Sequence, residues 1–112
     1  MKKEKVILKG RIFDVVRRKI KFPDGRMRDY DLVSHNGAVL IIPILSAEKV
    51  VLIRQFRAVI NKYLYELPAG TIDKGESAEK TAKRELIEEI GYSPGKMEKI
   101  IDIFPCPGYS TE

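Results

Sequence analysis

Short apolar runs separated by turn residues occupy most of the chain, and this pattern predicts strands. The turn Pro23-Asp24-Gly25 joins two of these runs into a hairpin. A second short turn at residues 46–48 joins two further runs that are strongly apolar. The predicted strands cover residues 6–9, 11–21, 27–34, 38–45, 49–56, 64–68 and 98–104.

One segment has the periodicity of a helix instead. Four apolar residues recur every four positions, as a buried helical face requires: Ala78, Ala82, Leu86 and Ile90. Ser77 suits the N-cap position and Gly91 the C′ position, so the stretch between them is predicted to be helical. Strands beside a helix form an α+β arrangement, which becomes a sandwich once a second helix covers the other face.

The same segment carries three carboxylates on one helical face. At about 100° per residue, Glu85 and Glu89 lie roughly 40° apart, and Glu88 lies about 60° to the other side of Glu85. Like charges at this spacing repel each other, and a divalent cation would stabilise them. Mg²⁺ and Mn²⁺ prefer carboxylate oxygens, so the pattern favours metal-assisted chemistry on a phosphate. A solvated acidic face is the alternative, although no lysine lies between Glu85 and Gly91.

The spacing of these residues resembles the Nudix box, the signature of hydrolases of nucleoside diphosphates linked to another moiety. The family pattern is Gly, five residues, Glu, seven residues, then Arg-Glu-apolar-any-Glu-Glu-any-Gly-apolar. The chain matches it from Gly70 through Glu76 to Arg84 and on to Gly91, and Tyr92 fills the last apolar position.

The resemblance implies a role for each matching residue. Glu85 and Glu89 would be the main metal ligands, with Glu88 as a further ligand or the holder of a metal-bound water. The Ala69 carbonyl would be a backbone ligand. Arg84 would pair with the glutamates of the box and fix their rotamers. The structural positions of the box are Gly70, Glu76 and Gly91.

The flanks of the box resemble the ADP-ribose pyrophosphatase branch of the family. Residues 54–57 read Arg-Gln-Phe-Arg, residues 66–70 read Glu-Leu-Pro-Ala-Gly, and Pro107 follows Gly91 by 16 residues. Two stretches near the N-terminus also look like that branch, in which these strands contact the substrate, often across a subunit interface. The substrate-binding candidates are Ile12, Phe13, Arg28, Asp31, Arg57, Glu66 and Gly108.

Several of these candidates have a structural alternative. Ile12 and Phe13 could serve in core packing, and Arg57 could be a surface strand residue. Pro107-Gly108 could be a loop turn only. Arg28 lies one position away from the place expected for a substrate-binding arginine of the branch.

The activity implied by the resemblance is metal-dependent hydrolysis of ADP-ribose to AMP and ribose 5-phosphate, with Mg²⁺ or Mn²⁺ as cofactor. Another diphosphate is the alternative substrate: a nucleotide sugar, a dinucleotide or a damaged nucleoside triphosphate. A catalytically impaired module that binds ADP-ribose is the alternative function. The residues expected to take part in catalysis are Glu88, Arg84 and Glu112, with Glu88 or Glu112 as the general base.

The fold implied by the resemblance is a Nudix-like α/β/α sandwich with a mixed sheet, here without the C-terminal strands and the second helix. A single domain over residues 1–112 would consist of four parts. These are an N-terminal hairpin at 4–35, a core sheet at 37–69, the loop and helix of the box at 70–92, and a strand and proline loop at 97–112. The uncovered sheet favours association, and a homodimer is expected.

Composition and charge fit this picture. The 112-residue chain has a net charge of +5, with residues 1–63 carrying +9 and residues 64–112 carrying −4. A basic portion facing an acidic helix suits an anionic diphosphate bridged to metal. Nucleic-acid binding is the competing interpretation, but no helix-turn-helix or zinc-finger spacing appears. A single cysteine, Cys106, excludes an internal disulfide, and neither a membrane-spanning run nor a signal peptide is present, so a cytoplasmic protein without membrane partners is expected.

Overall fold

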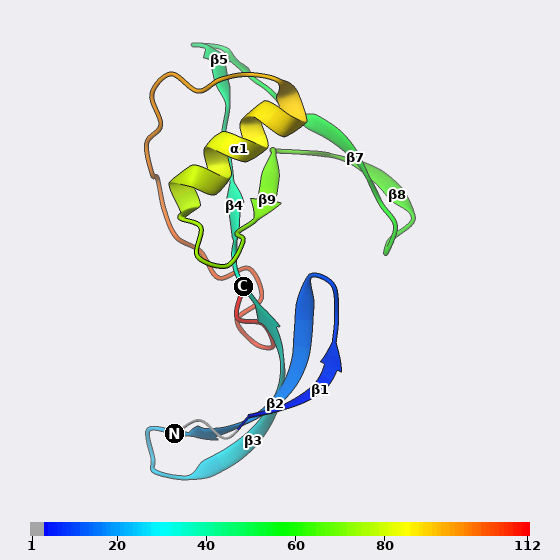
Figure 1. Ribbon diagram of the computed structural model, residues 1–112, viewed down its shortest axis with the longest axis vertical. Helices are drawn as coiled ribbons and strands as arrows, with labels where there is room; N and C mark the ends of the chain where they lie inside the picture. The colour runs from blue at the N-terminus through cyan, green and yellow to red at the C-terminus, as the bar shows by residue number, and fades with distance from the viewer. Residues whose placement is uncertain (1–3) are drawn as a thin grey trace. The chain divides into compact units, whose positions relative to one another are not determined.

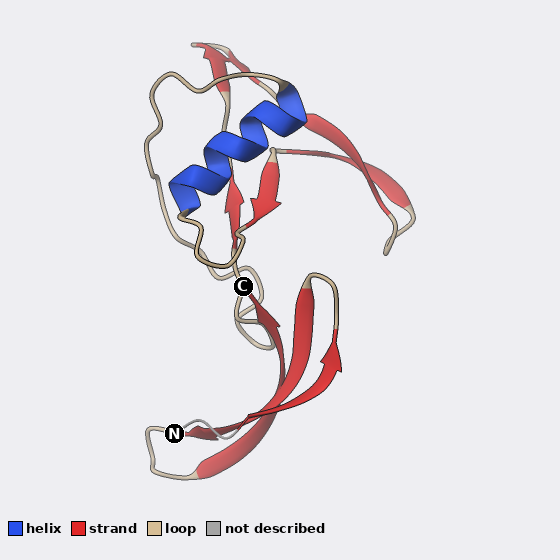
Figure 2. Ribbon diagram, viewed as in Figure 1, coloured by secondary structure: helices blue, strands red, loops and turns tan. Residues whose placement is uncertain are grey.

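The computed structural model describes residues 4–112. The chain forms two compact units, which are described separately (Figure 1). The first contains the chain up to Gly37 together with Ile100–Glu112, and the second contains Ala38–Lys99. Figure 2 shows that the helix belongs to the second unit, whereas strands occur in both.

The first unit is built on a three-stranded antiparallel sheet in the order β1-β2-β3. Its strands are β1 (Glu4–Lys9), β2 (Phe13–Lys21) and β3 (Met27–His35). The predicted hairpin turn joins β2 to β3, and Gly25 sits in it at φ 84°, a conformation that glycine adopts without strain. Val16 and Leu32 pair across the two strands and are both buried, so they anchor one face of the sheet.

The C-terminal segment runs alongside β3. Val33 donates its N–H to the Tyr109 carbonyl at 2.7 Å, and Thr111 donates its N–H to the Val33 carbonyl at 2.9 Å. These bonds form an isolated parallel bridge between Val33 and Ser110. The named ladders of residues 4–112 are otherwise antiparallel.

The prediction of a strand at residues 98–104 is wrong, because the described chain forms no ladder there. Ile100, Ile101 and Ile103 give this stretch a high strand propensity, yet they are exposed. Strand propensity measures how well a residue fits a pleated, half-buried surface, and it has no effect without a partner strand.

The second unit contains three antiparallel strand pairs. The pairs are β4 (Ala38–Leu40) with β9 (Ala69–Thr71), β5 (Ile44–Ser46) with β6 (Lys49–Val50), and β7 (Ile53–Arg57) with β8 (Lys62–Glu66).

Three predicted strands of this unit have different bounds from those expected. The apolar runs at 38–45 and 49–56 are each divided into two strands. In place of the strand predicted at 64–68, β8 ends at Glu66 and β9 begins after Pro68. Prolines explain part of this, because Pro43 and Pro68 have no N–H to donate to a ladder. Pro68 still contributes its carbonyl, which accepts a hydrogen bond from Ile41 N–H at 2.9 Å.

Helix α1 (Ala78–Ile90) packs against β4 and β9 (Figure 1). Ile41, Ala82 and Leu86 form the buried cluster, with Ile90 packed at its edge. Ala78 is exposed, so the predicted apolar stripe begins one turn later than expected. The predicted caps are present: Ser77 Oγ accepts the Lys80 N–H at 3.2 Å, and Gly91 at φ 72° donates to the Ile87 carbonyl.

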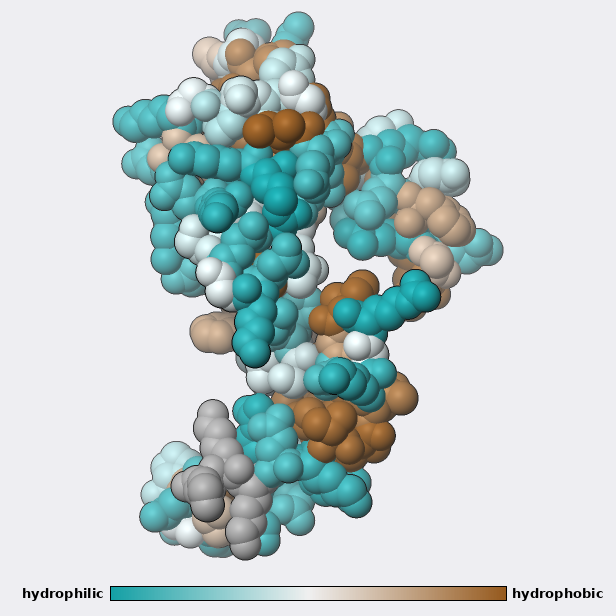
Figure 3. All heavy atoms as spheres, viewed as in Figure 1, coloured by the Kyte–Doolittle hydropathy of each residue, from teal (hydrophilic) through white to brown (hydrophobic). Residues whose placement is uncertain are grey.

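Many large apolar side chains are exposed in both units, as the brown spheres in Figure 3 illustrate. The most exposed include Val59, Tyr65, Ile44 and Phe104. Within residues 4–112, no helix has the length and apolar composition needed to cross a bilayer.

Candidate functional site

The acidic face of α1 lies against β9, and Gly70 is what allows the close approach. A methyl group placed on Gly70 would overlap the Glu85 side chain, which lies directly over this glycine. Gly70 pairs with Val39 in the β4–β9 ladder, so its position is fixed by the sheet. The first glycine of the box therefore holds the carboxylate of Glu85 at the junction of strand and helix.

Arg84 connects the carboxylates of the box. Its Nη2 donates to Glu76 Oε1 at 2.9 Å and its Nη1 donates to Glu85 Oε1 at 2.9 Å. Weaker contacts at 3.5 Å join it to Glu88 Oε2 and to Asp73 Oδ2. The neighbouring carboxylates raise the pKa of Arg84, chiefly through the hydrogen bonds to Glu76.

Glu76 is the most firmly held carboxylate of the site. Besides Arg84, it accepts a hydrogen bond from the hydroxyl of Thr81 at 2.5 Å. The hydrogen bonds from Arg84 first, and from Thr81 second, lower the pKa of Glu76 to about 2. Thr81 is fully buried and also donates to the Ser77 carbonyl, so it fixes Glu76 relative to the first helical turn.

Thr81 was not singled out by the sequence analysis. Its neighbour Ala82 belongs to the apolar stripe, and a threonine at the stripe's edge gives no periodic signal of its own. Only its position five residues after Glu76 indicates that the hydroxyl can reach that carboxylate.

Glu85 lies close enough to Glu89 to disfavour the negative charge of Glu89. Burial raises the pKa of Glu89, and the charge of Glu85 raises it further. A hydrogen bond from the Ala69 backbone N–H acts in the opposite direction. Glu85 has a side chain only 12% exposed, whereas that of Glu88 is 59% exposed, so the acidic face runs from a buried edge to solvent.

These donors have the chemistry that a hard divalent cation requires. Two mutually repelling carboxylates at a partly buried edge, next to the Ala69 backbone, are stabilised by positive charge. Arg84 supplies part of that charge in this structure. Across residues 4–112, no three Asp, Glu, His or Cys side chains converge in a geometry ready to hold a metal ion. The residues therefore fit a cation by donor type, and Glu85 would exchange its Arg84 contact for one to metal.

The β7–β8 pair contributes a second charged group to this side of the unit. Arg57 forms a bidentate ion pair with Glu66, in which Nε donates to Oε2 at 2.7 Å and Nη2 donates to Oε1. The hydrogen bonds from Arg57 lower the pKa of Glu66, and those to Glu66 raise the pKa of Arg57. Arg57 also lowers the pKa of Glu89, so the pair lies within electrostatic reach of the box.

The remaining candidates belong to the first unit. Ile12 and Phe13 are 64% and 42% exposed, so neither is a core residue in this structure. Asp31 accepts two hydrogen bonds from Arg17, which lower its pKa, and Arg28 lies over the Phe22 ring with 5.0 Å to its centroid. Gly108 and Glu112 lie in the C-terminal segment of the same unit.

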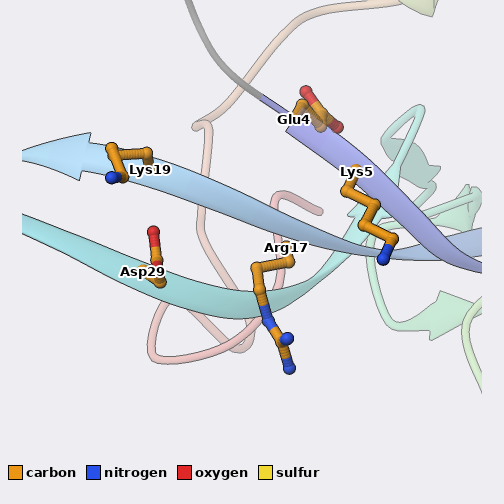
Figure 4. Close-up of a pocket in the computed structure, with 5 residues that line it drawn as sticks. All are labelled: Glu4, Lys5, Arg17, Lys19 and Asp29. Atoms are coloured by element: carbon orange, nitrogen blue, oxygen red, sulfur yellow. The ribbon is translucent and has the colours of Figure 1, made fainter.

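Two shallow depressions mark the first unit. One of about 210 Å³ lies on the sheet among side chains of both charges (Figure 4), lined by Glu4, Lys5, Arg17, Lys19 and Asp29. The other, of about 360 Å³, lies between β2–β3 and residues 107–111. Arg18 lines it with a buried Nε that has no hydrogen-bond partner among residues 4–112, while its Nη2 contacts Glu4 at 3.3 Å. Nothing in the sequence pattern distinguishes Arg18 from Arg17, the other arginine of β2.

Comparison with known proteins finds relatives over almost the whole chain. The NUDIX domain family matches residues 34–112. An ADP-ribose pyrophosphatase of Bacillus subtilis (strain 168) is 35% identical over 106 residues, which cover 95% of this chain and 57% of that protein. A methanol dehydrogenase activator of Bacillus methanolicus is 36% identical over 110 residues, covering 98% of this chain and 60% of that protein.

The fold has a counterpart among solved structures. The crystal structure of an ADP compounds hydrolase superimposes with a TM-score of 0.74 at 27% identity, covering 96% of this chain and 59% of that one. The chain thus spans less than two thirds of the length of the relatives it resembles.

Proposed function

The chain belongs to the NUDIX family, and we propose that it carries the metal-binding part of a hydrolase that converts ADP-ribose to AMP and ribose 5-phosphate. The observation that supports this most is the position of Glu85, whose side chain is only 12% exposed, over Gly70, together with Glu89, which accepts a hydrogen bond from the Ala69 N–H. The names of two relatives, an ADP-ribose pyrophosphatase and an ADP compounds hydrolase, favour ADP-ribose over other diphosphates.

The residues that would hold Mg²⁺ or Mn²⁺ are Glu85, Glu89, Glu88 and the Ala69 carbonyl. At these residues a divalent cation would supply positive charge to neutralise the diphosphate and to make an attacking water more acidic. Arg84 keeps the carboxylates in place through Glu76, whose hydrogen bond from buried Thr81 fixes one end of the network. Such supporting contacts orient ligands that would otherwise turn to solvent.

The reaction adds one water across the phosphoanhydride. The water oxygen forms a bond to one phosphorus, and the bond from that phosphorus to the bridging oxygen breaks. One phosphate leaves as AMP and the other as ribose 5-phosphate. The water's proton needs a carboxylate acceptor, and the Glu88 side chain is 59% exposed, with a contact of 3.5 Å to Arg84. Glu112 is the second candidate.

We propose substrate-binding residues for each unit separately. Arg57 offers a guanidinium near Glu89, where a diphosphate would lie. In the first unit, Ile12, Phe13, Arg28, Asp31 and Gly108 are proposed to contact substrate. In the second unit, Glu66 is proposed to take part in substrate binding through its pairing with Arg57.

Association into a homodimer is part of the proposal. The exposed apolar side chains of both units offer the surface that such an interface buries. A cytoplasmic location is proposed with it.

The proposal is tested by incubating the protein with a panel of diphosphates and Mg²⁺, with products followed by ³¹P NMR and binding measured in parallel. ADP-ribose is expected to yield AMP and ribose 5-phosphate faster than a nucleotide sugar or a dinucleotide yields its products. Equal cleavage of all diphosphates would contradict the substrate assignment. Binding of ADP-ribose without cleavage would instead identify a binding module, which the Arg84 contacts to Glu85 and Glu88 could favour.

A further inference from the structure

The bidentate ion pair between Arg57 and Glu66 limits how Arg57 can bind a phosphate. A guanidinium presents one planar edge of parallel N–H donors to a carboxylate or to a phosphate in the same geometry. In this structure the Nε and Nη2 edge of Arg57 is committed to Glu66. A phosphate cannot use that edge while Glu66 holds it.

The two partners differ in accessibility. The Arg57 side chain is 45% exposed, whereas that of Glu66 is 22% exposed. Both groups act on Glu89, since Arg57 lowers its pKa and Glu66 raises it. Arg57 is therefore a solvent-accessible cation that is paired with Glu66 and lies within electrostatic reach of Glu89.

We propose that Glu66 is an internal competitor for Arg57, which holds the guanidinium until a diphosphate beside Glu89 takes its place. On this view, Glu66 sets the affinity for the diphosphate and does not itself contact the substrate. The proposal rests on the proposed function, because it places the diphosphate of the substrate near Glu89.

The exchange is open to a solvent-borne phosphate because the Arg57 side chain is 45% exposed. Ion pairs of this kind contribute weakly in water, and a phosphate offers the guanidinium a stronger charge than the carboxylate that it replaces. The released Glu66 carboxylate would turn toward solvent at the end of β8. The arrangement thus keeps Arg57 positioned when substrate is absent and lets it act when substrate is present.

The test uses α,β-methylene-ADP, whose bridging carbon prevents hydrolysis, with affinities measured by calorimetry in Mg²⁺. Glu66→Gln keeps the side-chain shape and removes the charge that pairs with Arg57. This variant is expected to bind the analogue about two- to five-fold more tightly than wild-type protein, a range that corresponds to the energy of a surface ion pair. Unchanged or weaker binding by this variant would overturn the proposal.

A double-mutant cycle separates competition from simple removal of a negative charge. In an Arg57→Gln background, the Glu66→Gln change is expected to give no gain in affinity. A gain that persists without Arg57 would mean that Glu66 acts by charge alone, and the proposal would be wrong. Asp24→Asn is the matched control, because it frees the exposed Arg26 from a carboxylate in the hairpin turn and should leave affinity unchanged.

A second measurement needs no substitution. When wild-type protein is titrated with the analogue, the ¹³C signal of the Glu66 carboxyl group and the Nε–H signal of Arg57 are expected to shift together. A stationary Glu66 signal during saturation would contradict the exchange. The outcome is independent of turnover: a protein that binds the analogue in this way but leaves ADP-ribose intact would refute the proposed function only.

Discussion

The network around Arg84 shows how single residues set the chemistry of the site. One guanidinium contacts Glu76 and Glu85 at 2.9 Å each, and buried Thr81 completes the support of Glu76. The pairing of Arg84 with the glutamates was expected from the resemblance to the Nudix box. The support from Thr81 and the pairing of Arg57 with Glu66 were not, because both depend on contacts between elements.

Glu76 gives the first prediction at this scale. Its carboxyl is expected to titrate near pH 2, against about 4.5 when unfolded, because Arg84 and Thr81 stabilise its charge. A depressed folded-state pKa stabilises the fold above the unfolded value, and this stability is lost as pH falls from 4.5 toward 2. The melting temperature of wild-type protein should therefore fall more over that pH interval than the melting temperature of the Glu76→Gln variant. Equal losses, followed by circular dichroism, would show that Glu76 is not held in this way.

Glu89 gives the opposite prediction. Its pKa is raised by burial and by Glu85, so its negative charge works against the metal-free fold at neutral pH. The Glu89→Gln variant keeps an oxygen for the Ala69 N–H and removes the charge, and it should melt at a higher temperature than wild type at pH 7. Below the unfolded-state pKa of a glutamate the difference should vanish, because wild-type Glu89 is then protonated in both states.

Glu88→Gln is the matched control, because Glu88 lies on the same helical face and is mostly exposed. It should change the melting temperature much less than Glu89→Gln. A lower melting temperature for Glu89→Gln would contradict the account of its burial.

At the scale of elements, predictions succeeded where the sequence carries its own boundary signals. Helix α1 starts after Ser77 and ends before Gly91, as their capping chemistry indicates. Strand bounds in the second unit depended instead on partners. Pro43 and Pro68 interrupt apolar runs, and residues 98–104 stay outside any ladder despite their isoleucines. Pairing between distant segments decides such cases, and a single sequence does not encode it locally.

The end of α1 provides a prediction at this scale. Gly91 adopts φ 72° and closes the helix through its N–H to the Ile87 carbonyl. Alanine in this conformation costs about 1 kcal/mol, so Gly91→Ala should lower the free energy of unfolding by about that amount. Gly95→Ala is the control, because Gly95 has no positive φ and an added methyl meets no atom within 4 Å. Similar denaturation midpoints for both variants would show that the cap is not needed.

At the scale of the whole molecule, family membership and fold were predicted correctly. The NUDIX match and the TM-score of 0.74 confirm an α+β Nudix fold, with strands and a helix recognisable from the apolar pattern. The division into two compact units was not predicted. The first unit joins segments that are distant in sequence, and the segments of the second are separated by ordinary turns, so neither has a local sequence signal.

The exposed apolar side chains of both units lead to a prediction about assembly. Monomeric proteins rarely leave many large apolar residues in solvent, so self-association is expected. Sedimentation velocity at increasing concentration should show a dimer. Tyr65→Lys and Ile44→Lys change two of the most exposed apolar positions. A variant that shifts the equilibrium toward monomer identifies its surface as part of the interface. A monomer at all concentrations would contradict the homodimer.

The central claim is that Glu85 and Glu89, beside Gly70 and Ala69, hold a divalent cation for phosphate chemistry. Calorimetric titration of the folded protein with Mn²⁺ tests it most directly. Wild-type protein is expected to bind Mn²⁺ saturably, and the Glu85→Gln and Glu89→Gln variants are each expected to lose about ten-fold or more in affinity. Absence of Mn²⁺ binding by wild-type protein, or wild-type affinity in both variants, would contradict the claim.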